Sequence, residues 1–183
     1  MDFSPLSFSL KDGRTAVLRA PEPEDAEEML ACLAEVSQET DFLLATPAEW
    51  QAMSPAAEAA YLQTRRNDPN TLMLLCLVEG RLAGNCHVAF GTQAKTAHRG
   101  SIGIALRRAY WNQGIGTAMF QAILAEASRR PGVLQLELEM IEGNARGQAL
   151  YEKMGFRTVG VHPDAIRQPD GTLRHEYLMI RKL

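Results

Sequence analysis

The segment Asn-Gln-Gly-Ile-Gly-Thr-Ala (112–118) places Gly114 and Gly116 between a strand pattern and a helix pattern. Glycine in such a junction costs backbone conformational entropy, so a bare backbone must be needed there. The first turn of a helix presents unpaired N–H groups and the positive end of the helix dipole, and both attract anions. The spacing therefore indicates that the amides of 112–118 bind an anion, with a diphosphate as the natural ligand class. The alternative is a strand-to-helix turn without a ligand.

Two common phosphate loops fit this segment poorly. A Walker loop requires G-x-x-x-x-G-K-[ST], which is absent from the chain. A Rossmann loop requires G-x-G-x-x-G, and although Gly114 and Gly116 fit its first two glycines, Met119 occupies the third position. The strand before the loop also follows a hairpin pattern. Both observations argue against a nucleotide-binding oxidoreductase.

A second group of chemically useful residues follows one predicted strand later. Asn144 and Tyr151 are seven residues apart on a predicted helix, which brings them within about 20° of one face, and Gly147 lies between them. In the preceding strand, residues alternate, so Glu137 and Glu139 share the polar face.

The segments 112–124 and 136–156 together resemble the GNAT superfamily of N-acetyltransferases. The resemblance covers about residues 80–183, and the N-terminal third is similar only in element order. In that family the pattern [RQ]-x-x-G-x-[GA] cradles the pyrophosphate of coenzyme A. The usual register places Trp111 at its first position, whereas a register shifted by two, Gln113-x-x-Gly116-x-Ala118, matches literally. Both registers use nearly the same amides.

The resemblance implies a cofactor, acetyl-CoA, and a set of residues that hold it. The backbone of the strand end pairs with the pantetheine, the amide of Leu106 faces the thioester oxygen, the loop amides hold the diphosphate, and Asn144 contacts the pantetheine. The cofactor-binding residues expected in this way are Ile104, Ala105, Leu106, Asn112, Gln113, Gly114, Ile115, Gly116, Thr117, Asn144 and Tyr151. No metal site is expected.

The resemblance also implies an acid and a base. Tyr151 resembles the general acid that protonates the departing thiolate; a phenol near pKa 10 facing a thiol near 8.5 makes this transfer uphill by only ~2 kcal/mol. Glu139 resembles the base of the branch that acetylates ribosomal-protein N-termini, where it takes the amine proton through water. His87 and water alone are the alternatives for the base. The structural alternatives are a core or rim tyrosine, a solvated strand face, and an ordinary N-cap at Asn144.

Three cations near these segments raise a further question. Arg107, Arg108 and Lys153 could approach the 3′-phosphate of the cofactor. Solvation at the surface is the favoured interpretation for them, and packing is the favoured interpretation for Trp111.

The composition is that of one globular domain covering 1–183. The 183 residues carry a net charge of −3, and no Lys/Arg run exceeds two residues, which argues against a nucleic-acid partner. The three cysteines match neither a zinc spacing nor a disulfide framework, and this favours a reducing, cytoplasmic location. No apolar run is long enough for a bilayer, and the N-terminus lacks the pattern of a signal peptide.

The hydrophobic periodicity predicts a mixed α/β domain. Strands are expected at 14–21, 71–79, 82–91, 101–107, 133–141, 156–162 and 175–183, helices at 23–40, 54–67, 116–130 and 144–154, and an irregular segment at 41–53. With the resemblance, this predicts a GNAT fold: a mostly antiparallel seven-stranded sheet, splayed between the strands at 101–107 and 133–141, and flanked by four helices.

The function that the resemblance implies is acetyl transfer from acetyl-CoA to a primary amine of a small molecule or a protein N-terminus, by direct attack in a ternary complex. The resemblance also implies that acceptor choice depends on 41–50 and 161–179, where Asp41, Glu49 and Asp164 could bind a cationic amine. No membrane partner is expected, and family habit makes a homodimer plausible. The alternative is a regulatory module that binds an acyl-CoA with little turnover.

Overall fold

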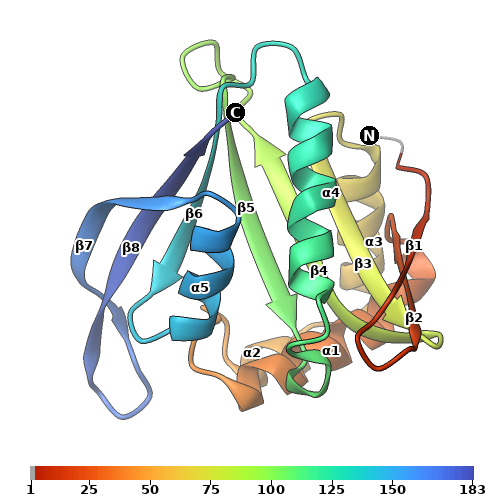
Figure 1. Cartoon of the computed structure of the whole chain (residues 1–183). Helices are drawn as coiled ribbons and strands as arrows, with labels where there is room; N and C mark the ends of the chain where they lie inside the picture. Colours follow the sequence, from red (N-terminus) through yellow and green to blue (C-terminus); the bar gives the residue numbers. More distant parts are fainter. Residues whose placement is uncertain (1–2) are drawn as a thin grey trace.

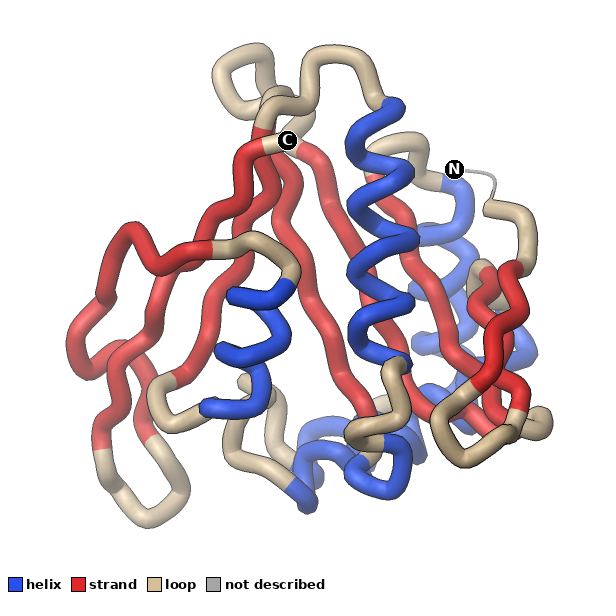
Figure 2. Tube along the Cα trace, viewed as in Figure 1, coloured by secondary structure: helices blue, strands red, loops and turns tan. Residues whose placement is uncertain are grey.

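Eight strands form one sheet in the order β1-β2-β3-β4-β5-β6-β8-β7 in the computed structural model, which describes residues 3–183 (Figures 1 and 2). Residues 1 and 2 of the predicted domain lie outside the described residues. Every neighbouring pair is antiparallel except β5 with β6, which is parallel. The strands are β1 (Leu6–Ser9), β2 (Thr15–Arg19), β3 (Thr71–Val78), β4 (Arg81–Phe90), β5 (Arg99–Leu106), β6 (Gln135–Ile141), β7 (Arg157–Arg167) and β8 (Leu173–Lys182).

The helices lie on the two faces of this sheet. In Figure 1, α4 and α5 lie in front of it, and α1 and α3 lie behind it. One apolar core fills the space between α4, α5 and the sheet, and a second lies between α1, α3 and the opposite face. The helices are α1 (Ala26–Glu39), α2 (Pro47–Ala52), α3 (Pro55–Asn67), α4 (Ile115–Arg129) and α5 (Ala145–Lys153).

The sheet opens between β5 and β6. Their pairing is limited to Arg99–Ser101 against Gln135–Glu137, after which the strands diverge (Figure 1). Residues 102–106 of β5 therefore keep a partner only on the β4 side. The predicted splay is confirmed, and it leaves a gap at the carboxyl end of β5 into which the start of α5 faces.

Two elements were not predicted, so the structure has eight strands and five helices instead of seven and four. Strand β1 is four residues long and mostly exposed at the sheet edge, too short for a periodicity signal. Helix α2 lies in the segment expected to be irregular; it has no buried residue and hence no apolar stripe. Its signal was the capping box of Thr46 with Glu49, with Pro47 in the first turn. In the C-terminal hairpin, β7 continues past the expected end at 162 to Arg167 through a register shift between His162 and Ile166.

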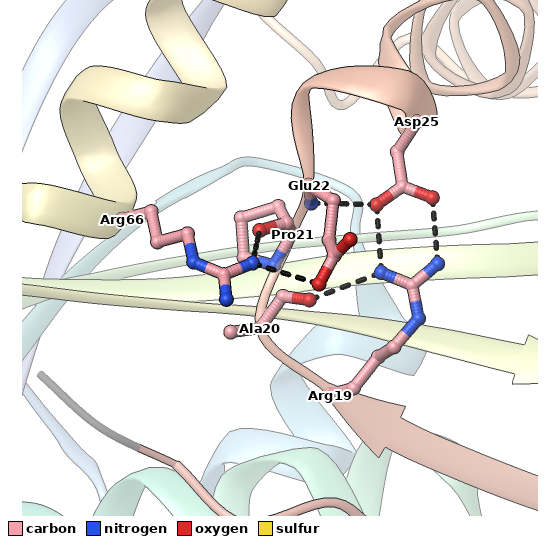
Figure 3. A network of polar contacts seen from close by, with 6 residues as sticks. All are labelled: Arg19, Ala20, Pro21, Glu22, Asp25 and Arg66. Carbon is pink, nitrogen blue, oxygen red and sulfur yellow. Dashed lines mark hydrogen bonds and ion pairs between the residues drawn. The ribbon is translucent and has the colours of Figure 1, made fainter.

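A polar network fixes the end of β2 to the helices behind the sheet (Figure 3). The Arg19 guanidinium donates two hydrogen bonds to the Asp25 carboxylate, at 2.7 and 2.6 Å. Arg66 of α3 donates to the carbonyl of Pro21 at 3.0 Å and to Glu22 at 2.9 Å. These contacts join the end of β2 to the turn before α1 and to α3.

No helix in residues 3–183 is long and apolar enough to cross a membrane. The three cysteines are buried and form no disulfide. Across the same residues, His, Cys, Asp and Glu form no cluster that could hold a metal ion.

Candidate functional site

The loop before α4 carries a row of unpaired backbone donors. Gly114 is the N-cap of α4 in the left-handed conformation (φ 93°), and Asn112 also has a positive φ of 64°. Within the described chain, no residue accepts a hydrogen bond from the amides of 112–117, and the first intrahelical bond is from the Ala118 amide to the Gly114 carbonyl at 3.0 Å. This arrangement fits an anion, because unpaired N–H groups and the positive end of the helix dipole both attract negative charge.

Gly116 serves the packing of two helices as well. A Cβ on Gly116 would lie 2.9 Å from Cδ2 of Leu150 on α5, closer than side chains normally approach. The missing side chain therefore lets the start of α4 lie close to α5.

The gap between β5 and α5 forms a cavity of about 340 Å³, here called the splay cavity. It is bounded by the end of β5, by the loop at Trp111 and Gly116, and by the first turns of α5. Of the residues predicted to bind the cofactor, the structure brings six to this cavity: Ile104, Ala105, Leu106, Gly116, Asn144 and Tyr151.

The other predicted cofactor residues lie elsewhere around the loop. Gln113, Gly114 and Thr117 line a separate cavity of about 460 Å³ between α4 and β1. The Ile115 side chain is buried in the core, and Asn112 accepts a hydrogen bond from Arg146 at 2.7 Å. These residues can contribute main-chain donors, whereas the side chain of Ile115 is turned to packing.

Asn144 caps α5. Its Oδ1 accepts a hydrogen bond from the Gly147 amide at 2.9 Å. A Cβ on Gly147 would lie 2.6 Å from Nδ2 of Asn144, so Gly147 allows the cap to close. The N-cap interpretation of Asn144 is correct, and the same side chain also borders the splay cavity.

Tyr151 is buried on the inner face of α5, with 8% of its surface exposed. Its ring packs at a tilt against Phe120 of α4, 5.6 Å between centroids. Burial raises the pKa of Tyr151 to about 12. The phenol thus stays protonated throughout the neutral range, although proton transfer from it to a thiolate is more uphill than for a solvated tyrosine.

A second and larger cavity of about 670 Å³, here called the acceptor cavity after the role that we propose for it below, lies mainly on the face of the sheet covered by α1 and α3 and reaches Phe120 of α4 and Tyr151 of α5. Sheet register places Asn85, His87, Gly103 and Ala105 on this face, since Asn85 pairs with Ala105 and His87 with Gly103. Its polar lining includes Glu58, Tyr61, Asn85, His87, Ser101, Glu139 and Glu176, with Tyr151 and Asn144 at its border with the splay cavity.

Both predicted candidates for the base line the acceptor cavity. Glu139 is exposed on β6, opposite Leu178 of β8. The His87 imidazole lies against Gly103, and burial, with a smaller contribution from Arg65, lowers its pKa. His87 is therefore neutral near pH 7, the form that can accept a proton.

The interpretation of Arg107 as a phosphate-binding or solvated residue is wrong. Its side chain is 3% exposed and forms ion pairs with Glu28 at 2.8 Å and Glu35 at 2.9 Å, and it also donates to the Leu82 carbonyl. Sequence could not reveal this, because both carboxylates come from α1, more than 70 residues away in the chain. Lys153 lies near the loop, donating to Thr117 Oγ1 at 3.2 Å.

Trp111 joins the loop to β5, as the packing interpretation required. Its Nε1 donates to the Leu106 carbonyl at 2.9 Å, and its ring is covered by the guanidinium groups of Arg108 at 5.3 Å and Arg146 at 4.2 Å. Arg146 was missed in the sequence, where it is simply an exposed residue in the first turn of a helix.

Glu58 was also missed. It lies on α3 at 2% exposure, four residues before the fully buried Leu62. Residues four apart share a helix face, so the spacing to Leu62 was the available signal for its burial.

Comparison with known proteins decides the family. A family model described as an acetyltransferase (GNAT) domain matches residues 16–157. The chain belongs to the GNAT acetyltransferase family. The sheet that opens between β5 and β6, with the glycine loop beside the opening, is thus a GNAT fold, as the sequence motifs predicted.

Solved GNAT structures align over nearly the whole chain. A GNAT-family acetyltransferase from Streptococcus pneumoniae is 26% identical, with a TM-score of 0.85, and the alignment covers 92% of this chain and 99% of that one. A ribosomal-protein-alanine N-acetyltransferase from Brucella melitensis is 21% identical (TM-score 0.75; 91% and 99% covered). A putative acetyltransferase from Salmonella typhimurium, solved with its cofactor acetyl-CoA, is 14% identical (TM-score 0.78; 92% and 94% covered). The Brucella and Salmonella proteins are less than 25% identical to this chain, so their similarity shows the shared fold alone.

Proposed function

We propose that this chain transfers the acetyl group of acetyl-CoA to a primary amine of a small molecule or a protein N-terminus, by direct attack in a ternary complex. The observation that carries the proposal is the junction of the two cavities. The splay cavity and the acceptor cavity share Phe42, Leu43, Ile104, Ala105, Asn144 and Tyr151. A donor in one and an amine in the other would meet beside these six residues.

The loop before α4 fits the diphosphate of coenzyme A. Free amides from 112 to 117 supply donors without a competing partner in the described chain, and Gly114 and Gly116 keep the approach open. Backbone groups of β5 beyond Ser101 lack a strand partner toward β6 and can pair with an amide-bearing arm such as pantetheine. Acetyl-CoA supplies the thioester whose carbonyl carbon accepts the amine.

The proton movements can be assigned to residues of the chain. As the new C–N bond forms and the C–S bond breaks, the amine loses one proton and the thiolate gains one. Tyr151 is the group we assign to the thiolate, because it is protonated at neutral pH and borders both cavities. The pKa of a thiol in the same buried surroundings is also raised, and this reduces the pKa difference between the thiol and the Tyr151 phenol.

The amine must reach the thioester in its neutral form. Glu139 can take the proton through water, as it lines the acceptor cavity and is open to solvent. His87 is the alternative, because it is neutral near pH 7 and lines the same cavity. Positioning two reactants in one site supplies most of the rate enhancement in such a reaction, so the base is expected to contribute the smaller part.

The proposal is tested by following free thiol release from acetyl-CoA with amines, amino acids and short peptides as acceptors, and by mass spectrometry of the products. Acceptor-dependent thiol release with one acetyl group on the acceptor is expected. Tight coenzyme A binding without acetylation of any acceptor would instead favour a regulatory acyl-CoA-binding module. Failure to bind coenzyme A at all would overturn both.

A further inference from the structure

The acceptor cavity contains two buried polar atoms that nothing in the described chain satisfies. Glu58 is 2% exposed and Asn85 is 5% exposed, and both line the cavity. Across residues 3–183, Glu58 Oε1 accepts no hydrogen bond and Asn85 Nδ2 donates none. Leaving a buried carboxylate oxygen and a buried amide unpaired costs free energy, so such a pair in one cavity indicates a ligand.

The charges around the cavity indicate the sign of that ligand. Three carboxylates line it, namely Glu58, Glu139 and Glu176, and no lysine or arginine of the described chain does. Burial alone raises the pKa of Glu58, consistent with a carboxylate that has lost water and gained no cation in return. A cationic group brought in by the acceptor would compensate this loss.

The remaining walls indicate the rest of the ligand. Met29 and Leu33 of α1, Trp50 and Met53 of the segment after it, Tyr61 of α3 and Met73 of β3 line the same cavity. These side chains offer an apolar and adaptable surface, which suits a methylene chain. The ligand should therefore be apolar between its polar ends.

Glu58 and the reacting position lie over different strands of the sheet. Helix α3 packs on β3, whereas the junction of the two cavities lies at β5. Two strand spacings lie between β3 and β5, roughly 10 Å. One amine of the acceptor can thus lie at Tyr151 while a second group lies at Glu58.

Resting on the proposed function, we infer that Glu58 and Asn85 form a subsite for the second, charged amino group of a linear aliphatic diamine, whose other amine is acetylated. Glu58 Oε1 accepts from the distal ammonium, and Asn85 Nδ2 donates to a water bound to that ammonium. The acceptor class is then α,ω-diamines rather than monoamines of the same length.

The test compares the α,ω-diamines of butane, pentane and hexane with butylamine, pentylamine and hexylamine. For the native protein, kcat/KM is expected to be ~tenfold or more higher for a diamine than for the matching monoamine, as for a desolvated ion pair at an interface. In Glu58→Gln this ratio should fall toward one. Glu27→Gln, which removes an exposed charge of α1, is the matched control and should keep the ratio. A native ratio near one, or a ratio unchanged in Glu58→Gln, overturns the subsite, and the native comparison stands even if Glu58→Gln does not fold.

A binding measurement separates this inference from the proposed function. Calorimetric titration of pentane diamine and of pentylamine into the protein, with and without coenzyme A, needs no turnover. Diamine binding that is stronger than monoamine binding and is weakened in Glu58→Gln supports the subsite even if no acetylation is found. Acetylation of other amines, with no preference for diamines in rate or binding, rejects the subsite and leaves the proposed function standing.

Discussion

The imidazole of His87 lies against the backbone of Gly103, its cross-strand partner in the β4–β5 ladder. A Cβ built on Gly103 would fall 2.4 Å from Cε1 of His87, a separation that side chains do not tolerate. The absence of a side chain at 103 therefore sets the orientation of His87 and shapes the wall of the acceptor cavity.

Gly103→Ala is expected to displace the His87 ring. We expect the free energy of unfolding to fall by ~1–3 kcal/mol, as for other overpacked sites, and the KM for the acceptor to rise while coenzyme A affinity is kept. Urea unfolding and steady-state kinetics measure both. Adding His87→Ala to Gly103→Ala should restore most of the lost stability, since the clash then has no partner. Equal losses with and without His87 would contradict this account of Gly103.

Tyr151→Phe removes only the hydroxyl and keeps the ring on Phe120. If Tyr151 protonates the thiolate, kcat should fall by about 10²-fold or more, with coenzyme A affinity within about twofold of the native value. Tyr177→Phe on β8, which lines neither the splay cavity nor the acceptor cavity, is the control. Because the pKa of Tyr151 is raised to about 12, native kcat should show no alkaline loss from this group below about pH 10. Full activity of Tyr151→Phe would remove this residue as the acid.

Gly116→Arg tests the loop. The new side chain would have to pass Leu150, 2.9 Å from the position of its Cβ, and it would fill the space above the free amides. Coenzyme A affinity is expected to fall by at least ~100-fold, the scale of losing several charge-assisted hydrogen bonds. Ser128→Arg adds the same side chain to the exposed far end of α4 and should bind normally. A folded Gly116→Arg protein with native affinity would place the diphosphate elsewhere.

The Arg107 ion pairs should respond asymmetrically to mutation. The guanidinium is 3% exposed, whereas the side chains of Glu28 and Glu35 are 46% and 38% exposed. Removing both carboxylates with Glu28→Gln and Glu35→Gln leaves a buried charge uncompensated and is expected to cost ~3 kcal/mol or more. Arg107→Met lets the two carboxylates return to water and should cost less. Denaturant unfolding of the two variants gives the comparison, and the reverse order would show that the carboxylates are not what stabilises Arg107.

Glu58 should make stability depend on pH in a defined direction. Its pKa is raised in the folded protein above the ordinary 4.5, so the folded state holds this proton more tightly than the unfolded chain. Stability from the protonated form is therefore present below pH 4.5 and is lost as the pH rises through the folded pKa.

Glu58→Gln cannot ionise, so its stability relative to the native protein should grow as the pH rises from 4.5 toward 8. His87, Glu139 and Glu176, which line the same cavity, are common to both proteins and cancel in the difference. Thermal unfolding of both proteins across this pH range tests the prediction. A stability difference that does not change with pH would show that Glu58 does not become an uncompensated charge in the folded protein.

Much of the fold and of the loop could be predicted because the signals are local. Glycines at 114 and 116, the helix after them and the N-cap at Asn144 depend on backbone conformation and short-range hydrogen bonds, which residue types and spacing report directly. The strands β3 to β6 carry apolar patterns of sufficient length, whereas β1 and α2 bury too little surface to leave such a pattern. The family resemblance then supplied the splay of the sheet.

Which side chains are buried, and which distant residues they contact, was decided only by the tertiary structure. The sequence by itself determined the GNAT family, the glycine turn that begins α4 and the helix that carries Tyr151. Packing of α1 on the sheet buries Arg107 against Glu28 and Glu35, and packing of α3 turns Glu58 into a cavity shared with Asn85 and His87. The physical reason is that a side chain's solvation, its partner and hence its pKa depend on atoms tens of residues away, whereas helix caps, turns and periodicity depend on neighbours in the chain.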